Sequence, residues 1–159
     1  MVTPDKQWIV FANGAEKESV SDSAKIQEAL KSNGCQIDEK QIGKMTLKIF
    51  EDSPAISTYI YGMDAGCYSV IENDNKKFAV PLRIAIRKSK IQFLDPRMLF
   101  RILESAIPFY EKFFSTGFPF KKYDTVFCPE FRIRGMENVG LINMTDKYFK
   151  PKAECTEFE

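Results

Sequence analysis

Histidine, the side chain used most often in catalysis and zinc binding, is absent from the 159 residues of this sequence. Catalytic zinc sites nearly always use at least one imidazole, and general acid–base catalysis also falls most often to histidine. Four cysteines, Cys35, Cys67, Cys128 and Cys155, lie far apart without a CxxC pair, so they predict reduced thiols, with neither a zinc knot nor a disulfide framework. Cys128 lies in an apolar segment with no histidine to activate it, which favours an inert buried thiol over a nucleophile. No residue of this chain is therefore predicted to be catalytic or to bind a metal.

One short segment, residues 131–142, has a composition that could recognise a ligand, and it reads FRIRGMENVGLI. Its single carboxylate is Glu137, which follows Gly135 and Met136 and precedes Asn138. A lone glutamate is by default a solvated carboxylate in a turn. The sequence on either side of the segment therefore decides how Glu137 is interpreted.

Residues 135–138, Gly-Met-Glu-Asn, resemble the core of the exopeptidase signature of the aminopeptidase N family. In that signature Gly-Ala-Met-Glu-Asn is followed by an apolar or aromatic residue and then by Gly-Leu, and here Val-Gly-Leu follows. Other family segments are matched in the expected order at residues 56–61 (ISTYIY), 65–66, 81–82, 87–89 and 118–131 (FPFKKYDTVFCPEF). The resemblance covers most of residues 5–13 and 45–155.

The resemblance implies a zinc aminopeptidase that removes N-terminal residues from peptides, with Gly135, Met136, Glu137 and Asn138 as substrate-binding residues. In this family the glutamate receives the free α-amino group of the substrate, and the physical need is clear, since an ammonium in a partly dry cleft must be paired with a carboxylate. The main chain around Gly135 would line the substrate like an added strand, and a small residue there lets two main chains approach.

The resemblance also implies that the zinc is held in the full-length protein by an H-E-x-x-H motif, which we expect to follow Glu159. We therefore expect no zinc on this chain alone and no peptidase activity from it. Two hypotheses remain open: a fragment of an active aminopeptidase, or a non-catalytic remnant that binds peptide N-termini or a related subunit.

Two positions depart from the family pattern. Arg134 replaces the usual first glycine of the signature, and Gly135 replaces the usual alanine. The guanidinium of Arg134 could pair with Glu137 and compete with substrate, or it could point away as a surface side chain. Residues 15–44 also match the family poorly and look like a local insertion.

The elements expected to position the segment follow from local patterns. Residues 7–13 predict a strand, residues 23–34 fit either a helix or a polar loop, and residues 45–88 predict an antiparallel β region. Its strands are expected at residues 46–50, 56–61, 66–71 and 80–86, with a hairpin loop at 72–77. Asp95-Pro96 predicts a helix start, and apolar residues then recur at helical spacing to residue 114. Pro108 should kink or end this helix early, and the Phe-rich run 109–120 is expected in the core.

These patterns predict an α+β fold in two parts. Residues 1–90 are expected to be the C-terminal half of an antiparallel, saddle-like N-terminal β domain. Residues 91–159 are expected to be the first helix and strands of a thermolysin-like catalytic domain.

Charge and hydropathy restrict the partners. Lys plus Arg number 23 and Asp plus Glu number 22, which gives no reason to expect nucleic acid or an anionic membrane as partner. No apolar stretch approaches the length needed to cross a bilayer and no secretory signal is apparent, so we expect a cytoplasmic protein whose partner is a peptide with a free N-terminus. Two half-domains would leave open sheet edges, which predict self-association.

Overall fold

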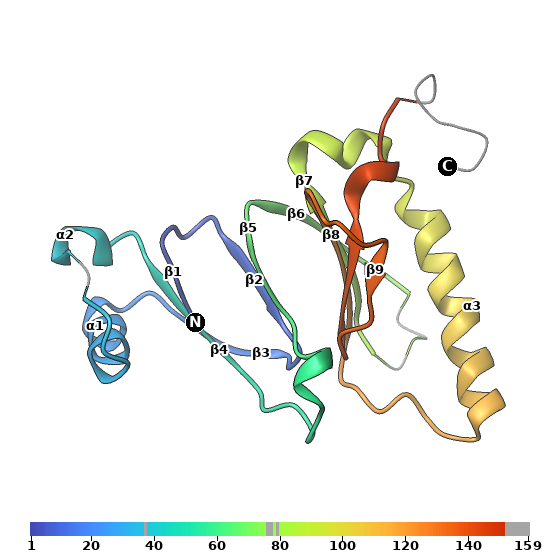
Figure 1. The fold of residues 1–159 in the computed structure, drawn as a ribbon, viewed down its shortest axis with the longest axis horizontal. Coiled ribbons are helices and arrows are strands. Elements are labelled where there is room, and N and C mark those ends of the chain that lie inside the picture. The colour runs from blue at the N-terminus through green and yellow to red at the C-terminus, as the bar shows by residue number, and fades with distance from the viewer. Residues whose placement is uncertain (37, 76–77, 79, 152–159) are drawn as a thin grey trace. The chain divides into compact units, whose positions relative to one another are not determined.

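The computed structural model describes residues 1–36, 38–75, 78 and 80–151. It divides into two compact units, Met1–Cys67 and Tyr68–Glu159. The first unit contains a three-stranded antiparallel sheet in the order β1–β4–β3 and a two-stranded antiparallel sheet of β2 and β5 (Figure 1). Its strands are β1 (Val2–Thr3), β2 (Ile9–Ala12), β3 (Glu16–Val20), β4 (Thr46–Phe50) and β5 (Met63–Gly66).

Helix α1 (Ser23–Ser32) lies in the region that could have been helix or loop, and the short helix α2 (Glu39–Ile42) follows it. Asp22 caps α1, since its side chain accepts a hydrogen bond of 2.9 Å from the main-chain N–H of Lys25. Ile26 and Leu30 are buried on one face of α1 and form a small core with residues of α2 and the following turn. The helical alternative is therefore confirmed for this segment.

The strand predicted at residues 56–61 is wrong, because this segment forms the 3₁₀ helix η1 (Thr58–Ile60). Ser57 caps it by accepting a hydrogen bond from the N–H of Tyr59 at 3.3 Å. Tyr59 and Tyr61 are 66% and 60% exposed. The segment therefore lacks the buried face that would support a strand.

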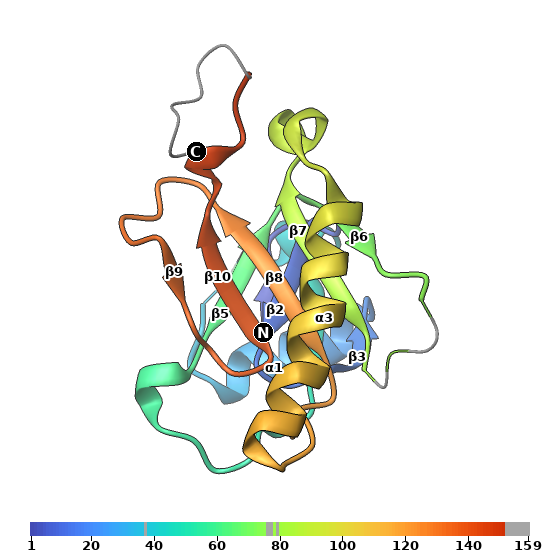
Figure 2. The ribbon, with the colours of Figure 1, turned by 90° about the vertical axis from the view of Figure 1, so that its right-hand side faces the viewer.

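The second unit is built on a five-stranded mixed sheet in the order β6–β7–β8–β10–β9. Its strands are β6 (Tyr68–Glu72), β7 (Leu82–Arg87), β8 (Tyr123–Cys128), β9 (Gly135–Met136) and β10 (Leu141–Thr145). The pairs β6–β7 and β9–β10 are antiparallel, whereas β7–β8 and β8–β10 are parallel. Helix α3 (Pro96–Phe114) connects β7 to β8 and lies across one face of the sheet (Figure 2). The 3₁₀ helices η2 (Lys88–Phe93) and η3 (Asp146–Tyr148) follow β7 and β10. The chain is thus α+β, as predicted.

Helix α3 begins where the sequence predicted. The Asp95 side chain accepts hydrogen bonds from the N–H groups of Arg97 and Met98 at 3.1 and 3.2 Å, and Pro96 occupies the first turn. The early end expected at Pro108 is wrong, because the helix continues to Phe114. Pro108 is exposed and lacks the N–H that would bond the carbonyl of Glu104, so the helix continues with one hydrogen bond fewer.

The core of the second unit lies between α3 and the sheet. It consists of apolar side chains from β7, α3 and β8: Leu82, Ile84, Ile86, Phe100, Ile107 and Phe127. The prediction that the Phe-rich run belongs to the core is wrong for its helical part, since Phe109, Tyr110, Phe113 and Phe114 are 54–67% exposed. A helix on one side of a sheet buries one stripe, and here that stripe contains Phe100 and Ile107.

The division of the structure between Cys67 and Tyr68 differs from the boundary expected near residue 90. The reason is that β7, which precedes α3, pairs in parallel with β8, which follows it. This pairing joins residues before and after position 90 into one sheet. The assignment of residues 1–90 and 91–159 to two family domains stays a prediction. Among the described residues, no helix is long and apolar enough to cross a membrane.

Candidate functional site

The signature residues begin in the edge strand of the five-stranded sheet. Gly135 and Met136 make up β9, opposite Met144 and Asn143 of β10, and the carbonyl of Arg134 accepts a hydrogen bond of 3.1 Å from the N–H of Thr145. β9 is the last strand in the sheet order of the described residues (Figure 2). An edge strand offers main-chain N–H and C=O groups with which an extended peptide can pair.

Gly135 packs closely over a side chain of the neighbouring strand. A Cβ atom at this position would lie 2.9 Å from Sδ of Met144 and 3.5 Å from the carbonyl oxygen of Asn143. The nearest obstacle is therefore the end of a flexible thioether chain. The alanine usual in the family could fit here if Met144 turned aside.

Glu137 and Asn138 have opposite environments although they are adjacent. The side chain of Glu137 is exposed, whereas Asn138 is only 5% exposed. The N–H of Leu141 donates to the carbonyl of Asn138 at 3.1 Å, and Gly140 within this turn has a φ of +67°. A left-handed φ suits glycine, which lacks the Cβ that would clash. The turn therefore buries Asn138 and leaves Glu137 accessible to a ligand.

A chain of buried hydrogen bonds holds the side chain of Asn138. Its Nδ2 donates to Oδ1 of Asn143 at 2.6 Å, and Nδ2 of Asn143 donates to Sγ of Cys128 at 3.2 Å. The thiol of Cys128, 8% exposed, contacts the carbonyl of Val126 at 3.6 Å. Cys128 is thus buried, as predicted, but sequence reasoning missed that it supports the signature residue Asn138. The contact could not be foreseen because it depends on the register of β8 against β10.

A second, charged network holds the other end of the turn. Nζ of Lys122 donates to Oδ2 of Asp124 and to the carbonyl of Gly140, both at 2.7 Å. Arg83 binds the same carboxylate in bidentate fashion, through Nε at 2.6 Å and Nη2 at 2.7 Å. Basic residues in a charge pattern are usually solvated, but Lys122 is only 4% exposed and the Arg83 side chain 24%.

The pKa of Lys122 reflects this burial. Desolvation, the largest influence, lowers the pKa of Lys122 below its ordinary value, the charge and hydrogen bond of Asp124 oppose this, and Arg83 adds to the lowering. The sequence did contain one signal for the pair. Lys122 and Asp124 are two residues apart at the start of a strand, which places their side chains on the same face.

Arg134, the unusual residue of the signature, is exposed. Its main-chain carbonyl continues the pairing of β9 with β10, as described above for Thr145. Exposure fits a surface arginine, and the competing idea of a pair with Glu137 stays a prediction.

Comparison with known proteins identifies the family. Residues 99–157 match the family model described as the peptidase family M1 domain. Aminopeptidase N of Streptomyces lividans is 36% identical over 115 residues, which cover 69% of this chain and 13% of that protein. The chain belongs to the aminopeptidase N family. This confirms the resemblance found in the sequence.

Further members of the aminopeptidase N family are similar at lower identity. Aminopeptidase M1-D of Oryza sativa subsp. japonica is 28% identical over 120 residues, covering 74% of this chain and 13% of that protein. Leucyl aminopeptidase of Saccharolobus solfataricus is 27% identical over 139 residues, covering 86% and 17%. The chain therefore spans 13–17% of the length of these relatives. The substrate-binding roles of Gly135, Met136, Glu137 and Asn138 stay predictions.

The described part of this family member does not supply a metal site. Within residues 1–36, 38–75, 78 and 80–151, no group of three or more Cys, Asp or Glu residues is arranged to hold a metal ion, and the sequence has no histidine to add. The described residues therefore do not fit the zinc that the family implies. The chemistry that these residues themselves can supply is the binding of a peptide main chain and of a cation.

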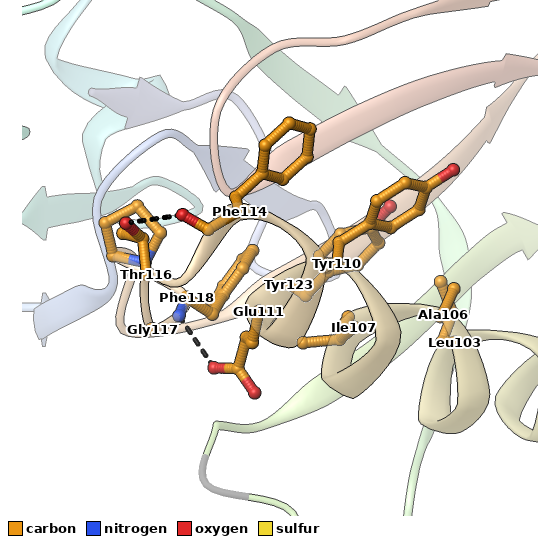
Figure 3. Close-up of a pocket in the computed structure, with 11 residues that line it drawn as sticks. Leu103, Ala106, Ile107, Tyr110, Glu111, Phe114, Thr116, Gly117, Phe118 and Tyr123 are labelled. Carbon is orange, nitrogen blue, oxygen red and sulfur yellow. Dashed lines mark hydrogen bonds between the residues drawn. The ribbon is translucent and has the colours of Figure 1, made fainter.

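A cavity of about 480 Å³ lies elsewhere in this unit, between the second half of α3 and residues 116–119 (Figure 3). Its walls are mainly apolar and include Ile107, Phe114 and Phe118. The carboxylate of Glu111 in its wall accepts a hydrogen bond of 2.7 Å from the N–H of Phe118. This carboxylate is thus used to fix the end of the helix, and β9 contributes no residue to the cavity.

Proposed function

We propose that residues 135–138 are the part of a zinc aminopeptidase that recognises the N-terminus of a peptide substrate. The observation that carries the proposal is an exposed carboxylate, Glu137, directly after a two-residue edge strand in a member of the aminopeptidase N family. The related proteins are named as aminopeptidases. The whole protein would then remove N-terminal residues from peptides.

The geometry supports a division of roles within the segment. An extended peptide pairing with the outer edge of β9 would have its main-chain groups satisfied there. Its first residue would lie beside Glu137, whose carboxylate would accept hydrogen bonds from the α-ammonium. Such a charge-assisted bond contributes about 1.5–3 kcal/mol, which corresponds to roughly 10- to 150-fold in affinity.

Several finer points belong to the same proposal. Residues 91–159 would form the start of a thermolysin-like catalytic domain, and the zinc would be held by residues other than those described. A cytoplasmic location is supported by the thiols of Cys35 and Cys67, which are not in a disulfide. The chain alone is expected not to hydrolyse aminoacyl-coumarin substrates, and clear hydrolysis by the purified chain would contradict this expectation.

The binding experiment compares two peptides of one sequence, with a free and with an acetylated N-terminus. NMR titration of the ¹⁵N-labelled chain gives both dissociation constants. We expect the free amine to bind at least about tenfold more tightly, and Glu137→Gln to abolish the difference. Glu130→Gln is the matched control, since Glu130 is exposed in the connection before β9, as Glu137 is in the connection after it, and undergoes the same loss of charge. Equal binding of the two peptides to the unaltered chain would refute the proposed function.

A further inference from the structure

Lys122 is a buried lysine in direct contact with the main chain of the turn at residues 138–141, which we call the signature turn. Its ammonium group donates to the carbonyl of Gly140 at 2.7 Å, and the same carbonyl accepts the main-chain N–H of Asp124 at 3.1 Å. Gly140 follows Glu137 by three residues in the chain. A single side chain directly before β8 thus reaches the turn that follows the residues expected to bind substrate.

The placement of Lys122 is costly unless it is compensated. A buried ammonium loses its hydration, and only an ion pair with further hydrogen bonds offsets that loss. Asp124, fully buried, supplies the ion pair and is itself held by Arg83 through two hydrogen bonds. An apolar side chain at position 122 would avoid the desolvation of the ammonium, but Asp124 would lose one of its two cationic partners.

The contact acts on Glu137 through the turn. On one side of Glu137, Met136 is paired with β10. On the other side, the N–H of Leu141 donates to the carbonyl of Asn138, and Lys122 holds the carbonyl of Gly140. The main chain of Glu137 therefore lies between two fixed points only a few residues apart.

We propose that Lys122 is a positioning residue for recognition of the substrate's N-terminus. By holding the Gly140 carbonyl it fixes the turn of residues 138–141, and with it the main chain from which Glu137 reaches the α-amine. Asp124 and Arg83 hold Lys122 in this position. The inference rests on the proposed function, and it adds residues outside the signature to the recognition site.

The test uses three variants of the whole chain. Lys122→Met keeps the length of the side chain and removes its charge, whereas Lys122→Arg keeps the charge and hydrogen-bonding capacity. Lys121→Met is the matched control, because Lys121 is adjacent to Lys122 but exposed, and the substitution removes the same charge. The first measurement is the ratio of dissociation constants for the acetylated and the free peptide. The second is amide hydrogen exchange at Leu141, with the amides of α1 as internal reference.

We expect Lys122→Met to lower the free-amine preference by about tenfold, Lys122→Arg to restore most of it, and Lys121→Met to leave it unchanged. Exchange at Leu141 should become faster in Lys122→Met while α1 is unaffected. Partial unfolding would weaken both peptides equally, because each binds the folded fraction, so a purely structural role would not change the ratio.

A wild-type ratio in Lys122→Met would overturn the proposal. If the unaltered chain shows no preference for the free amine, the proposed function fails, and the exchange at Leu141 then decides whether Lys122 holds the turn. If Lys122→Met does not fold, Arg83→Gln takes its place, since Arg83 is partly exposed and is connected to the turn through Asp124 and Lys122. An unchanged ratio and unchanged exchange in Arg83→Gln would also overturn it.

Discussion

Replacement of Asn138 by alanine would show how strongly the signature turn is held by its own buried side chain. Asn138 is 5% exposed, and its Nδ2 donates at 2.6 Å to Asn143, which in turn donates to Cys128. Alanine removes the donor but leaves the other buried polar groups in place. Loss of one partner from a buried hydrogen bond costs about 1–3 kcal/mol, more than an average exposed bond contributes.

The assay has to report on the second unit. The single tryptophan, Trp8, lies in the first unit, so its fluorescence would follow the wrong part of the chain. Amide hydrogen exchange at Thr145, whose N–H donates to the carbonyl of Arg134 directly before β9, measures the opening of the segment directly. A loss of 1–3 kcal/mol predicts exchange that is roughly 5- to 150-fold faster.

Two further variants sharpen the result. Asn138→Asp should be worse than Asn138→Ala, because it brings a carboxylate oxygen against Oδ1 of Asn143, and both are acceptors. Asn33→Ala is the control, since Asn33 is exposed and its Nδ2 donates to the carbonyl of Ala29 at 2.8 Å. Exchange in Asn138→Ala within about twofold of the unaltered chain, or an aspartate that is tolerated better than alanine, would refute the reasoning.

Two other predictions follow from single contacts. Gly135→Ala should reduce the free energy of unfolding, measured in urea titrations, by less than about 1 kcal/mol. The reason is that, of the atoms around the added Cβ, only Sδ of the flexible Met144 side chain would lie closer than 3.0 Å. A larger loss would show that the Met144 side chain cannot move. Burial raises the pKa of Tyr123 above its ordinary value of 10.0. As the pH rises, the phenol therefore ionises in the unfolded chain before it ionises in the folded chain. The contribution of the neutral Tyr123 to stability is full below pH 10 and is lost as the pH rises above 10. Urea unfolding of the second unit between pH 9 and 11 should therefore show a steeper loss for the unaltered chain than for Tyr123→Phe, and parallel curves would contradict the burial effect.

Local patterns predicted those parts of the fold that depend on neighbouring residues. The start of α3 was predictable because Asp95 and Pro96 act within one helical turn. The signature residues were predictable because they form a short continuous motif. The segment at residues 56–61 was misjudged for the opposite reason, since a strand requires a partner that the local sequence does not reveal.

The support of the site could not be predicted because it joins distant parts of the chain. Arg83 and Asp124 are 41 residues apart, and Lys122 and Gly140 are 18 residues apart. They meet only because β7 and β8 run parallel across the α3 connection and β10 joins the far side of β8. A charge pattern read along the sequence treats such lysines and arginines as solvated by default.

The environments of the four signature residues separate structural from binding roles. Gly135 packs against Met144, Met136 is paired with Asn143, and Asn138 is buried and hydrogen-bonded. Each of these residues has a role in holding the segment, whatever binds there. Glu137 differs from them in exposure, because it is exposed between the strand and the turn that hold its main chain. Surface substitutions usually change stability by no more than about 0.5 kcal/mol, so Glu137→Gln should leave the fold intact while it removes the charge that a peptide α-amine requires.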